Sequence, residues 1–368
     1  MTRRHRVVLA SVVLAGVALL LAAATATAKP PRSFFGVTPQ RALEDADLAR
    51  MEKAKVGTVR FELHWAGIDP GPGGDYDWSA PDRTVARAAQ RGIRALPFAF
   101  ATPQWVAELD GHDCGAGSCG TFAPTGAAAL RAWREFLAAA VRRYGPDGEL
   151  WQENPQLPEL PIRNWQLWNE QNSPSFYAPK PNVKNYAKLL RAGRKAITAR
   201  DKGADIILGG MFGTPRGGQK PAIAAWDYLA KLYDKGAKRD FDGVAPHPYA
   251  PKFESVVLQI DLLRDEMRAA RDGKADLWIT EIGWASGGPP NPLNRGPAGQ
   301  AARLKQAFKY FVKKRKRLNI RNVDWYSWRD NSGSGTALCE WCPYSGLVDD
   351  DLNAKPSLRA FTNFTGGS

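Results

Sequence analysis

Histidine is scarce in this chain of 368 residues, which has only four, one of them at position 5. A metal-dependent hydrolase on an α/β scaffold would need a cluster of His and Asp ligands, and His64, His112 and His247 do not readily supply one. The first apolar run after residue 30, "FFGVTPQ" (34 to 40), offers no Gly-rich phosphate loop. We therefore expect no metal and no cofactor, and the metal-dependent hydrolase is the weaker alternative.

Cysteine is also rare, with four residues in two close pairs, Cys114 with Cys119 and Cys339 with Cys342. In an oxidising compartment an even count predicts disulfides, and four thiols allow three connectivities. Local pairing within each pair is the preferred interpretation. A zinc site that uses His112, or redox chemistry at "CEWC" (339 to 342), is a less favoured alternative because the spacings match neither pattern well.

The first residues have the order of a secretory signal. Basic residues at positions 3, 4 and 6 precede an apolar run from Val7 to about Ala24, and Ala26-Thr27-Ala28 follows. We predict that residues 1 to 28 are a signal peptide and that the protein is secreted, or at least extracytoplasmic, without stable membrane insertion after cleavage. An uncleaved anchor is the alternative, since the apolar run approaches the roughly 18 residues that span a bilayer.

The formal net charge is +14, yet no nucleic-acid-binding motif accompanies it. The densest basic run, "KKRKR" (313 to 317), falls on a predicted helix and is typical of a solvated face. An acidic partner is compatible with this charge but not required by it. We expect no nucleic-acid partner and a monomeric protein.

Eight short apolar runs alternate with amphipathic stretches along the remaining chain. Strict alternation predicts a parallel sheet with crossover helices, and eight repeats fit an α/β fold of the (β/α)8 TIM-barrel type. A doubly wound open sheet is the competing architecture. The predicted strands are 34 to 37, 56 to 63, 93 to 100, 162 to 169, 205 to 211, 241 to 247, 277 to 283 and 322 to 328.

Helix signals separate these strands. Ser79 is placed to cap a helix with Pro81 and Asp82 in its first turn, and Gly92 ends that helix. We assign residues 29 to 368 to one barrel domain with an extended loop region from 101 to 161. Further helices are predicted near 125 to 144, 184 to 200, 222 to 235, 256 to 270 and 300 to 316.

Two glutamates lie at the ends of predicted strands four and seven, Glu170 in "IRNWQLWNE" and Glu281 in "LWITEIG". In such barrels the chemistry lies at the C-terminal ends of the strands, so both carboxyl groups should face one mouth. Hydrolysis of a glycosidic bond needs such a pair, one carboxylic acid that protonates the leaving oxygen and one carboxylate that attacks or activates water.

Four motifs in barrel order carry a family resemblance: Arg60 on strand two, "WNE" ending at 170, "HPY" at 247 to 249 and "TEIGW" at 280 to 284. Together they resemble the clan A glycoside hydrolases, which are retaining (β/α)8-barrel enzymes. The stretches "YDWSAPDRTVARAAQRGIRALPF" and "YSGLVDDDLNAKPSLRAF" are most similar to bacterial family 39 and family 5-like members. Gln171 and Asn172 depart from the pattern, since many relatives have a proline after the motif.

The resemblance implies roles for five polar residues. Glu170 would be the general acid/base and Glu281 the nucleophile of a double displacement, with the carboxyl groups about 5 to 5.5 Å apart. Asn169 would hydrogen-bond the sugar 2-hydroxyl. Arg60 would keep Glu281 ionised, and Tyr249 would donate a hydrogen bond to the same carboxylate.

The resemblance further implies that His247 lines the substrate subsite and that Trp328 is a platform for the sugar ring. A packed core histidine is an almost equal reading of His247. His64 is a possible subsite residue, and the tryptophans at 65, 105, 284 and 341 belong either to the cleft or to the core.

The sequence therefore predicts a secreted retaining β-glycoside hydrolase that acts on a β-linked oligo- or polysaccharide. A transglycosylase, or a carbohydrate-binding barrel with little hydrolysis, is the alternative. The cysteine-containing loops after strands three and eight are expected to wall one end of the cleft, which would favour exo action.

Overall fold

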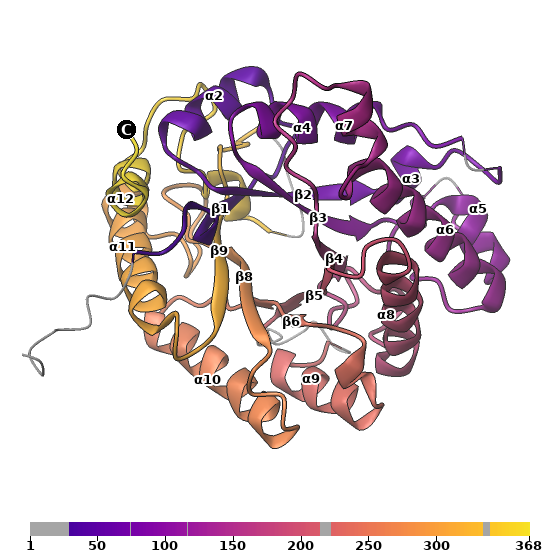
Figure 1. The fold of residues 1–368 in the computed structure, drawn as a ribbon. Coiled ribbons are helices and arrows are strands. Elements are labelled where there is room, and N and C mark those ends of the chain that lie inside the picture. The colour runs from indigo at the N-terminus through magenta and orange to yellow at the C-terminus, as the bar shows by residue number, and fades with distance from the viewer. Residues whose placement is uncertain (1–28, 74, 116, 214–221, 334–338) are drawn as a thin grey trace, which may run out of the picture. The chain divides into compact units, whose positions relative to one another are not determined.

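Parallel strands form a closed barrel within residues 32 to 368, a unit separate from residues 1 to 31 (Figure 1). The structure is a computed structural model that describes residues 29–73, 75–115, 117–213, 222–333 and 339–368. The predicted signal peptide lies outside the described residues. Among the described residues, no helix combines the length and apolar character needed to cross a bilayer.

The strands follow the order β4-β3-β2-β1-β9-β8-β6-β5-β7, and pairing of β4 with β5 closes the barrel. Because β6 and β7 are two short pieces of one strand that both pair with β5, the barrel has the eight strand positions that the sequence predicts. The strands are β1 (Phe35–Thr38), β2 (Thr58–His64), β3 (Arg94–Phe100), β4 (Asn164–Asn169), β5 (Asp205–Phe212), β6 (Gly243–Val244), β7 (Pro246–His247), β8 (Asp276–Ile282) and β9 (Ile320–Tyr326).

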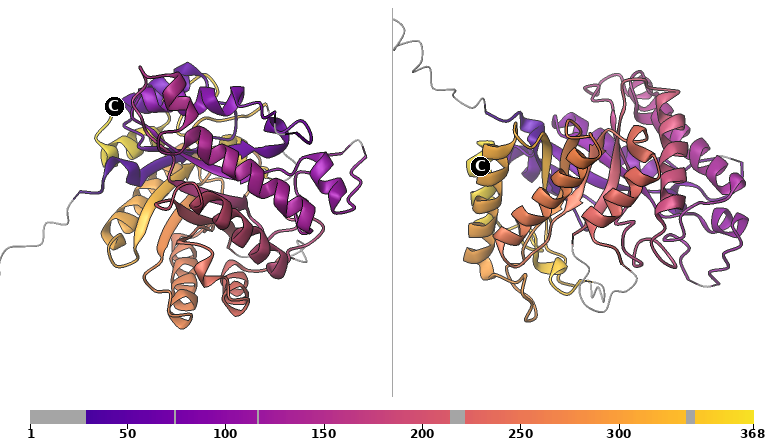
Figure 2. Two further views of the ribbon diagram at one scale, coloured as in Figure 1. Left: turned by 45° about the vertical axis from the view of Figure 1, so that its right-hand side comes forward. Right: turned by 90° about the horizontal axis from the view of Figure 1, so that it is seen from below.

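Helices surround the strands on the outside (Figures 1 and 2). The predicted (β/α)8 architecture is therefore confirmed, and the loop region 101 to 161 contains α5, α6 and α7. The helices are α2 (Asp45–Lys53), α3 (Trp65–Ile68), α4 (Ser79–Gln90), α5 (Gln104–Leu109), α6 (Ala127–Tyr144), α7 (Glu149–Glu153), α8 (Val183–Thr198), α9 (Ala225–Asp234), α10 (Phe253–Ala269), α11 (Gly296–Lys314) and α12 (Pro356–Thr365), with short 3-10 turns η1 (Arg32–Phe34), η2 (Ala237–Arg239) and η3 (Cys342–Tyr344).

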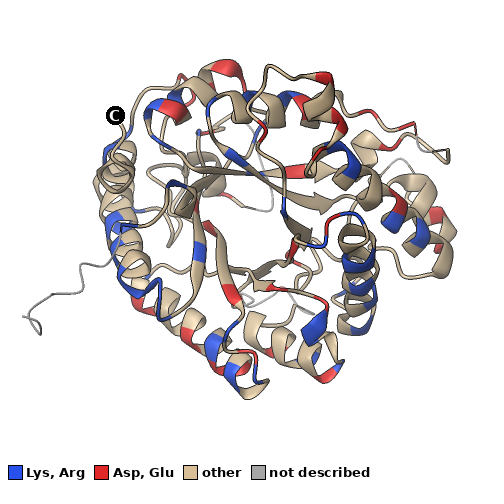
Figure 3. Ribbon diagram, in the orientation of Figure 1, with Lys and Arg blue, Asp and Glu red and all other residues tan. Residues whose placement is uncertain are grey.

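Two local predictions are wrong. The N-cap of α4 is Trp78 rather than Ser79, because the Asp77 carboxylate already accepts the Ser79 backbone N–H at 2.9 Å. The eighth barrel strand runs from Ile320 to Tyr326 and not from 322 to 328. Lys and Arg residues are distributed along the outer helices, including α8 and α11, as Figure 3 shows. Lys313 is exposed at the end of α11, as expected of a solvated face.

The strand that carries Glu170 departs from regular geometry. Trp168 and Glu170 have φ values of 76° and 40°, in the left-handed region that costs a non-Gly residue free energy. A hydroxyl group fills the resulting gap between β4 and β5: Tyr186 Oη on α8 donates to the Leu167 carbonyl and accepts the Gly209 N–H, both at 2.8 Å. The unusual backbone of the "WNE" motif is thus held from outside the barrel.

An acidic side chain is buried inside the barrel on β9. Asp324 is fully buried, and no Lys or Arg among the described residues forms an ion pair with it. On the adjacent strand β1, a Cβ atom at Gly36 would lie 1.8 Å from Asp324 Oδ1, so the glycine makes room for this carboxyl group. Burial raises the pKa of Asp324 to about 8, although a hydrogen bond with the Asn322 side chain and then the Arg60 charge oppose the rise.

We predict that Tyr186→Phe destabilises the protein by about 1 to 3 kcal/mol, because it leaves two buried backbone groups between β4 and β5 unpaired. Chemical denaturation measures the effect. Tyr228→Phe is the matched control, since Tyr228 is also fully buried but its hydroxyl has no hydrogen-bond partner among the described residues. Equal losses in the two variants would contradict the bridging role of Tyr186.

A second prediction concerns pH. The Asp324 carboxyl stays protonated in the folded state up to pH about 8 but ionises near pH 4 when unfolded, so stability falls as pH rises between these values. Asp324→Asn removes this loss. Its unfolding free energy relative to wild type should therefore increase by on the order of a few kcal/mol from pH 4 to pH 8, whereas the exposed Asp75→Asn should follow wild type. Parallel pH profiles for Asp324→Asn and wild type would refute the assignment.

Candidate active site

A cavity of about 990 Å³ opens at the C-terminal ends of the barrel strands. It is lined by side chains from the ends of β1, β2, β4, β8 and β9 and from the segment 339 to 342. A cavity of this volume lies at the upper end of the range of about 300 to 1,000 Å³ that is usual for ligand-binding pockets. Glu170 and Glu281, predicted from opposite parts of the sequence, both line it.

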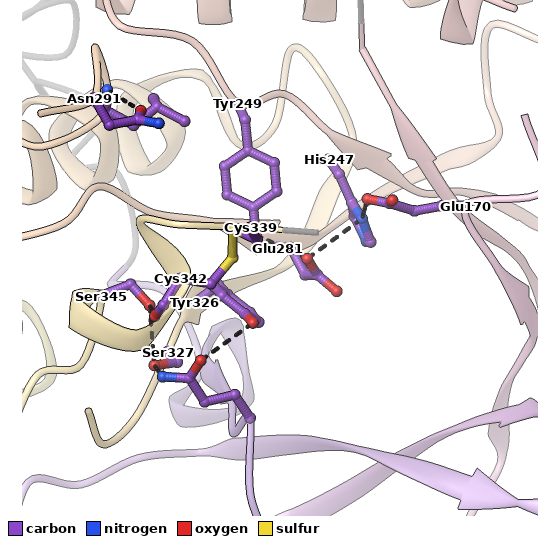
Figure 4. Close-up of a disulfide and its surroundings, with 12 residues drawn as sticks. Glu170, His247, Tyr249, Glu281, Asn291, Tyr326, Ser327, Cys339, Cys342 and Ser345 are labelled. Atoms are coloured by element: carbon purple, nitrogen blue, oxygen red, sulfur yellow. Dashed lines mark hydrogen bonds and ion pairs between the residues drawn. A yellow bond between two sulfur atoms is a disulfide. The ribbon is translucent and has the colours of Figure 1, made fainter. Parts of the chain in front are cut away.

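The two glutamates approach each other across the mouth. One carboxylate oxygen of Glu170, one of Glu281 and a ring nitrogen of His247 all lie within 4.8 Å of one another. The side chains of both glutamates are 12% exposed. Figure 4 shows the His247 ring beside both carboxyl groups. Strand order thus brings together two acids that are 111 positions apart in the chain.

Arg60 on β2 connects this site to the barrel wall. Its guanidinium group is fully buried and donates to Glu281 Oε1 at 2.6 Å, Asn169 Oδ1 at 2.8 Å and Gln166 Oε1 at 2.6 Å, while its Cζ lies 4.0 Å from the centre of the Phe98 ring. Because Arg60 occupies the carbonyl oxygen of Asn169, the amide nitrogen of Asn169 keeps its donors for a ligand.

The second oxygen of Glu281 accepts a hydrogen bond from the Tyr249 hydroxyl at 2.7 Å. Both oxygens of Glu281 therefore have a fixed partner, as the sequence predicts for Arg60 and Tyr249. Glu170 is held differently: its Oε1 lies 2.9 Å from His247 Nδ1, and its Oε2 has no hydrogen-bond partner among the described residues. Oε2 is consequently the oxygen of Glu170 that is available to a bound molecule.

His247 lies behind the glutamates rather than in the cavity wall. Its ring is fully buried, with Nδ1 at 2.9 Å from Glu170 and Nε2 at 3.0 Å from Thr280 Oγ1. The prediction that it lines the substrate subsite is therefore wrong, and its contacts are those of a hydrogen-bonded core residue. Burial and then the Arg60 charge lower its pKa well below the usual value, which keeps the imidazole neutral.

The two carboxyl groups differ in acidity. Burial, followed by the charge of Glu281, raises the pKa of Glu170 well above its usual value, and Arg60 only partly opposes this. Burial also raises the pKa of Glu281, but Arg60 and the Tyr249 hydroxyl, which bind it directly, oppose the rise. Arg60 thus lowers the pKa of Glu281 without cancelling the effect of burial. A single proton shared by the pair resides mainly on Glu170.

Glu170, His247 and Glu281 are also near enough to one another to hold a cation. The Arg60 guanidinium, however, already lies 2.6 Å from the Glu281 oxygen, and a divalent ion at that carboxylate would be repelled by its fixed charge. His247 further directs Nδ1 to Glu170 rather than to open space. The donor set suits an acid pair with a permanent counter-charge better than a metal centre.

Trp328, the predicted sugar platform, and two tryptophans that the sequence assigns either to the cleft or to the core all belong to the core. Trp65, Trp284 and Trp328 are fully buried and do not line the cavity. The Trp65 indole N–H donates to Asp69, that of Trp284 to the Ala250 carbonyl and that of Trp328 to Asp47. Trp328 is two residues beyond the end of β9, and its hydrogen-bond acceptor, Asp47, belongs to the outer helix α2.

Two aromatic rings at the cavity come from residues other than the predicted platform Trp328. Tyr326, the last residue of β9, and Trp341 both line the cavity. Their rings pack edge-on at 6.0 Å, and that of Trp341 lies 5.0 Å from Tyr249. Placing the end of the eighth strand two residues earlier would have identified Tyr326. Of the predicted subsite residues, His64 does line the cavity.

Both disulfides have the predicted local pairing, Cys114 with Cys119 and Cys339 with Cys342. The zinc alternative therefore loses its thiols, and His112 stacks on Phe122 instead.

Cys339 and Cys342 line the cavity beside Tyr249 and Tyr326 (Figure 4). No described residue between 101 and 161 lines the cavity, so the expectation that this loop walls the cleft is wrong.

The sequence matches no protein-family model and no curated protein sequence. Solved structures are nevertheless similar in fold. A family 39 glycoside hydrolase from Bacteroides cellulosilyticus aligns with a TM-score of 0.61 and 19% identity over 91% of this chain. This chain covers 64% of that relative, somewhat less than two thirds of its length.

This chain covers a larger share of two further solved structures. A glucosidase from Croceicoccus marinus has a TM-score of 0.65 and 13% identity over 92% of this chain and 68% of its own. A family 5 glycoside hydrolase of Bifidobacterium longum, in complex with Manβ1-4GlcNAc, has a TM-score of 0.64 and 16% identity over 90% of this chain and 77% of its own. These TM-scores establish a (β/α)8 fold in common with these glycoside hydrolases.

Proposed function

We propose that the protein is a retaining β-glycoside hydrolase. The observation that carries the proposal is the pair of carboxyl groups, Glu170 and Glu281, which meet within 4.8 Å and have different partners. Such a close approach suits direct attack by one carboxylate, since inverting enzymes separate their carboxyl groups by about 6.5 to 9.5 Å to admit a water. The substrate would be a β-linked oligo- or polysaccharide, a carbohydrate class to which the glycosidase folds of the structural neighbours also point.

In the first step Glu281 attacks the anomeric carbon while Glu170 gives its proton to the leaving oxygen. Direct contact with Arg60 and Tyr249 favours the ionised form of Glu281 relative to Glu170 and fixes the direction of its oxygens. The raised pKa of Glu170 keeps it protonated for donation. Its Oε2, which has no hydrogen-bond partner among the described residues, can face the glycosidic oxygen. A glycosyl-enzyme ester on Glu281 results.

In the second step Glu170, now ionised, takes a proton from water as that water attacks the same carbon. The ester bond to Glu281 breaks at the same time, which releases the sugar and restores the Glu281 carboxylate. The neutral His247 imidazole can donate Nδ1–H to Glu170 Oε1, and this hydrogen bond stabilises the carboxylate that exists between the two steps. Attack of water from the face that the aglycone has left restores the original configuration at the anomeric carbon.

Sugar binding would rest on the aromatic and amide groups of the cavity. Tyr326 and Trp341 offer flat apolar surfaces to a sugar ring face, and the free amide donors of Asn169 can reach a hydroxyl.

Secretion is part of the proposal. It is supported by the signal-like order of residues 1 to 28 and by the two disulfides, which are typical of oxidising compartments.

A screen of aryl β-glycosides and of plant and bacterial polysaccharides tests the function. We predict that Glu281→Ala reduces hydrolysis of each responsive substrate to background. Glu170→Ala should lower kcat/KM by roughly 10² to 10⁴ on polysaccharides, and by less on aryl glycosides whose leaving group needs no proton. The exposed Glu108→Ala is the control. Wild-type activity of Glu281→Ala on every responsive substrate would exclude the mechanism.

The pH profile gives an independent prediction. Activity requires ionised Glu281 and protonated Glu170, so kcat/KM should rise through the pKa of Glu281 and fall through the higher pKa of Glu170. Tyr249→Phe removes a hydrogen bond that lowers the pKa of Glu281. The acidic limb should therefore move to higher pH, with a loss of about tenfold to hundredfold in kcat/KM. An unchanged acidic limb would contradict the role of Tyr249.

A further inference from the structure

A third carboxylate faces the cavity from β2. Arg60, Glu62 and His64 occupy alternate positions of this strand and thus share one face, and all three line the cavity. Their side-chain exposure increases from 0% through 38% to 55%, so the row leads from the catalytic pair towards the opening. Glu62 and His64 have no part in the mechanism proposed above.

The orientation of His64 is fixed by the backbone that follows it. His64 Nδ1 accepts the Gly67 N–H at 2.8 Å and so caps α3. In the neutral imidazole an accepting Nδ1 requires the proton on Nε2, which makes Nε2 a permanent donor. Gly67 permits this contact, because a Cβ atom there would lie 2.9 Å from Nδ1.

Glu62 supplies the matching acceptor. Its Oε1 lies 3.8 Å from His64 Nε2, beyond hydrogen-bond distance. Neither the Glu62 carboxylate nor His64 Nε2 has a hydrogen-bond partner among the described residues. Partial burial of Glu62 raises its pKa, while the nearby His64 and Arg60 oppose the rise. The partly buried Glu62 carboxylate, as acceptor, and His64 Nε2–H, as donor, therefore lie side by side and face the same part of the cavity.

We propose that Glu62 and His64 form a two-point recognition site for two adjacent hydroxyl groups of a sugar unit, and that this pair sets substrate selectivity. The inference rests on the proposed function and names a determinant of its substrate class. One hydroxyl donates to the Glu62 carboxylate, and its neighbour accepts from His64 Nε2–H. A hydroxyl can do both, whereas an ammonium group has no acceptor for His64 and a carboxylate would be repelled by Glu62.

Selectivity follows from the cost of leaving one of these groups unpaired. A sugar whose hydroxyls have the wrong configuration displaces water from Glu62 and His64 without replacing its hydrogen bonds. Epimers at the recognised carbons should therefore be rejected more strongly than sugars that differ elsewhere. The same pair leaves the acid/base chemistry of Glu170 and Glu281 untouched.

The test uses the full chain with 4-nitrophenyl β-glucoside, β-galactoside, β-mannoside, β-xyloside and β-cellobioside. We expect Glu62→Ala to lower kcat/KM on the best of these substrates at least tenfold and to bring the values for the panel closer together, with the pH optimum unchanged. Glu62→Gln, which keeps one acceptor oxygen, should lose less. His64→Asn removes the Nε2 donor while an Asn at that position can still cap α3, so it separates recognition from folding. Glu108→Ala is the matched surface control.

Binding gives a readout without turnover. Cellobiose and mannobiose are titrated into Glu281→Ala, with intrinsic tryptophan fluorescence as the signal, and addition of Glu62→Ala should raise Kd for the tighter disaccharide at least tenfold. The inference is overturned if Glu62→Ala and His64→Asn keep the wild-type ratios of kcat/KM across the panel within twofold. The proposed function fails by a different result, namely hydrolysis that survives Glu281→Ala.

Discussion

The buried guanidinium of Arg60 is the interaction on which the site depends. It lies inside the barrel with no exposed surface and has three hydrogen-bond acceptors, one each from Gln166, Asn169 and Glu281. A buried cation is tolerated only when it is paired and fully hydrogen-bonded, so the positions of these acceptors on β4 and β8 are constrained together. The charge in turn allows two carboxyl groups to approach each other where water is largely excluded.

The asymmetry between the glutamates arises from this single charge. Arg60 contacts Glu281 directly but reaches Glu170 only through space, and Tyr249 adds a second donor to Glu281 alone. Burial raises the pKa of both groups, and the larger rise falls on Glu170, which is hydrogen-bonded to a neutral imidazole instead. Gln166 and Thr280 join the two sides, because the Gln166 amide donates to Thr280 and the Thr280 hydroxyl contacts His247. One polar network beneath the cavity therefore distinguishes acid from nucleophile.

The same strand geometry explains the selectivity inferred for Glu62 and His64. Alternate residues of β2 point into the barrel, so the row that begins with the buried Arg60 continues outward to the cavity rim. The residues of the Arg60 network are already hydrogen-bonded to one another. Residues nearer the opening therefore determine which substrates bind. Tyr326, Trp341 and the Glu62–His64 pair are such residues, and none of them contributes to the Arg60 network.

Local patterns in the sequence determined the alternation of strands and helices, the pairing of near cysteines and the location of Glu170 and Glu281 at strand ends. These features depend on side chains that are close in sequence or on the rule that parallel strands end at one face. Tertiary structure alone decided which aromatic rings reach the cavity. Trp328 and Tyr326 differ by two positions, and only the true end of β9 buries the first against Asp47 and exposes the second. Tertiary structure also decided that His247 is a core residue and not a subsite residue, because its burial depends on neighbours from distant strands. The role of Tyr186 could not be predicted either, because its hydroxyl bonds two backbone groups that come together only in the folded barrel.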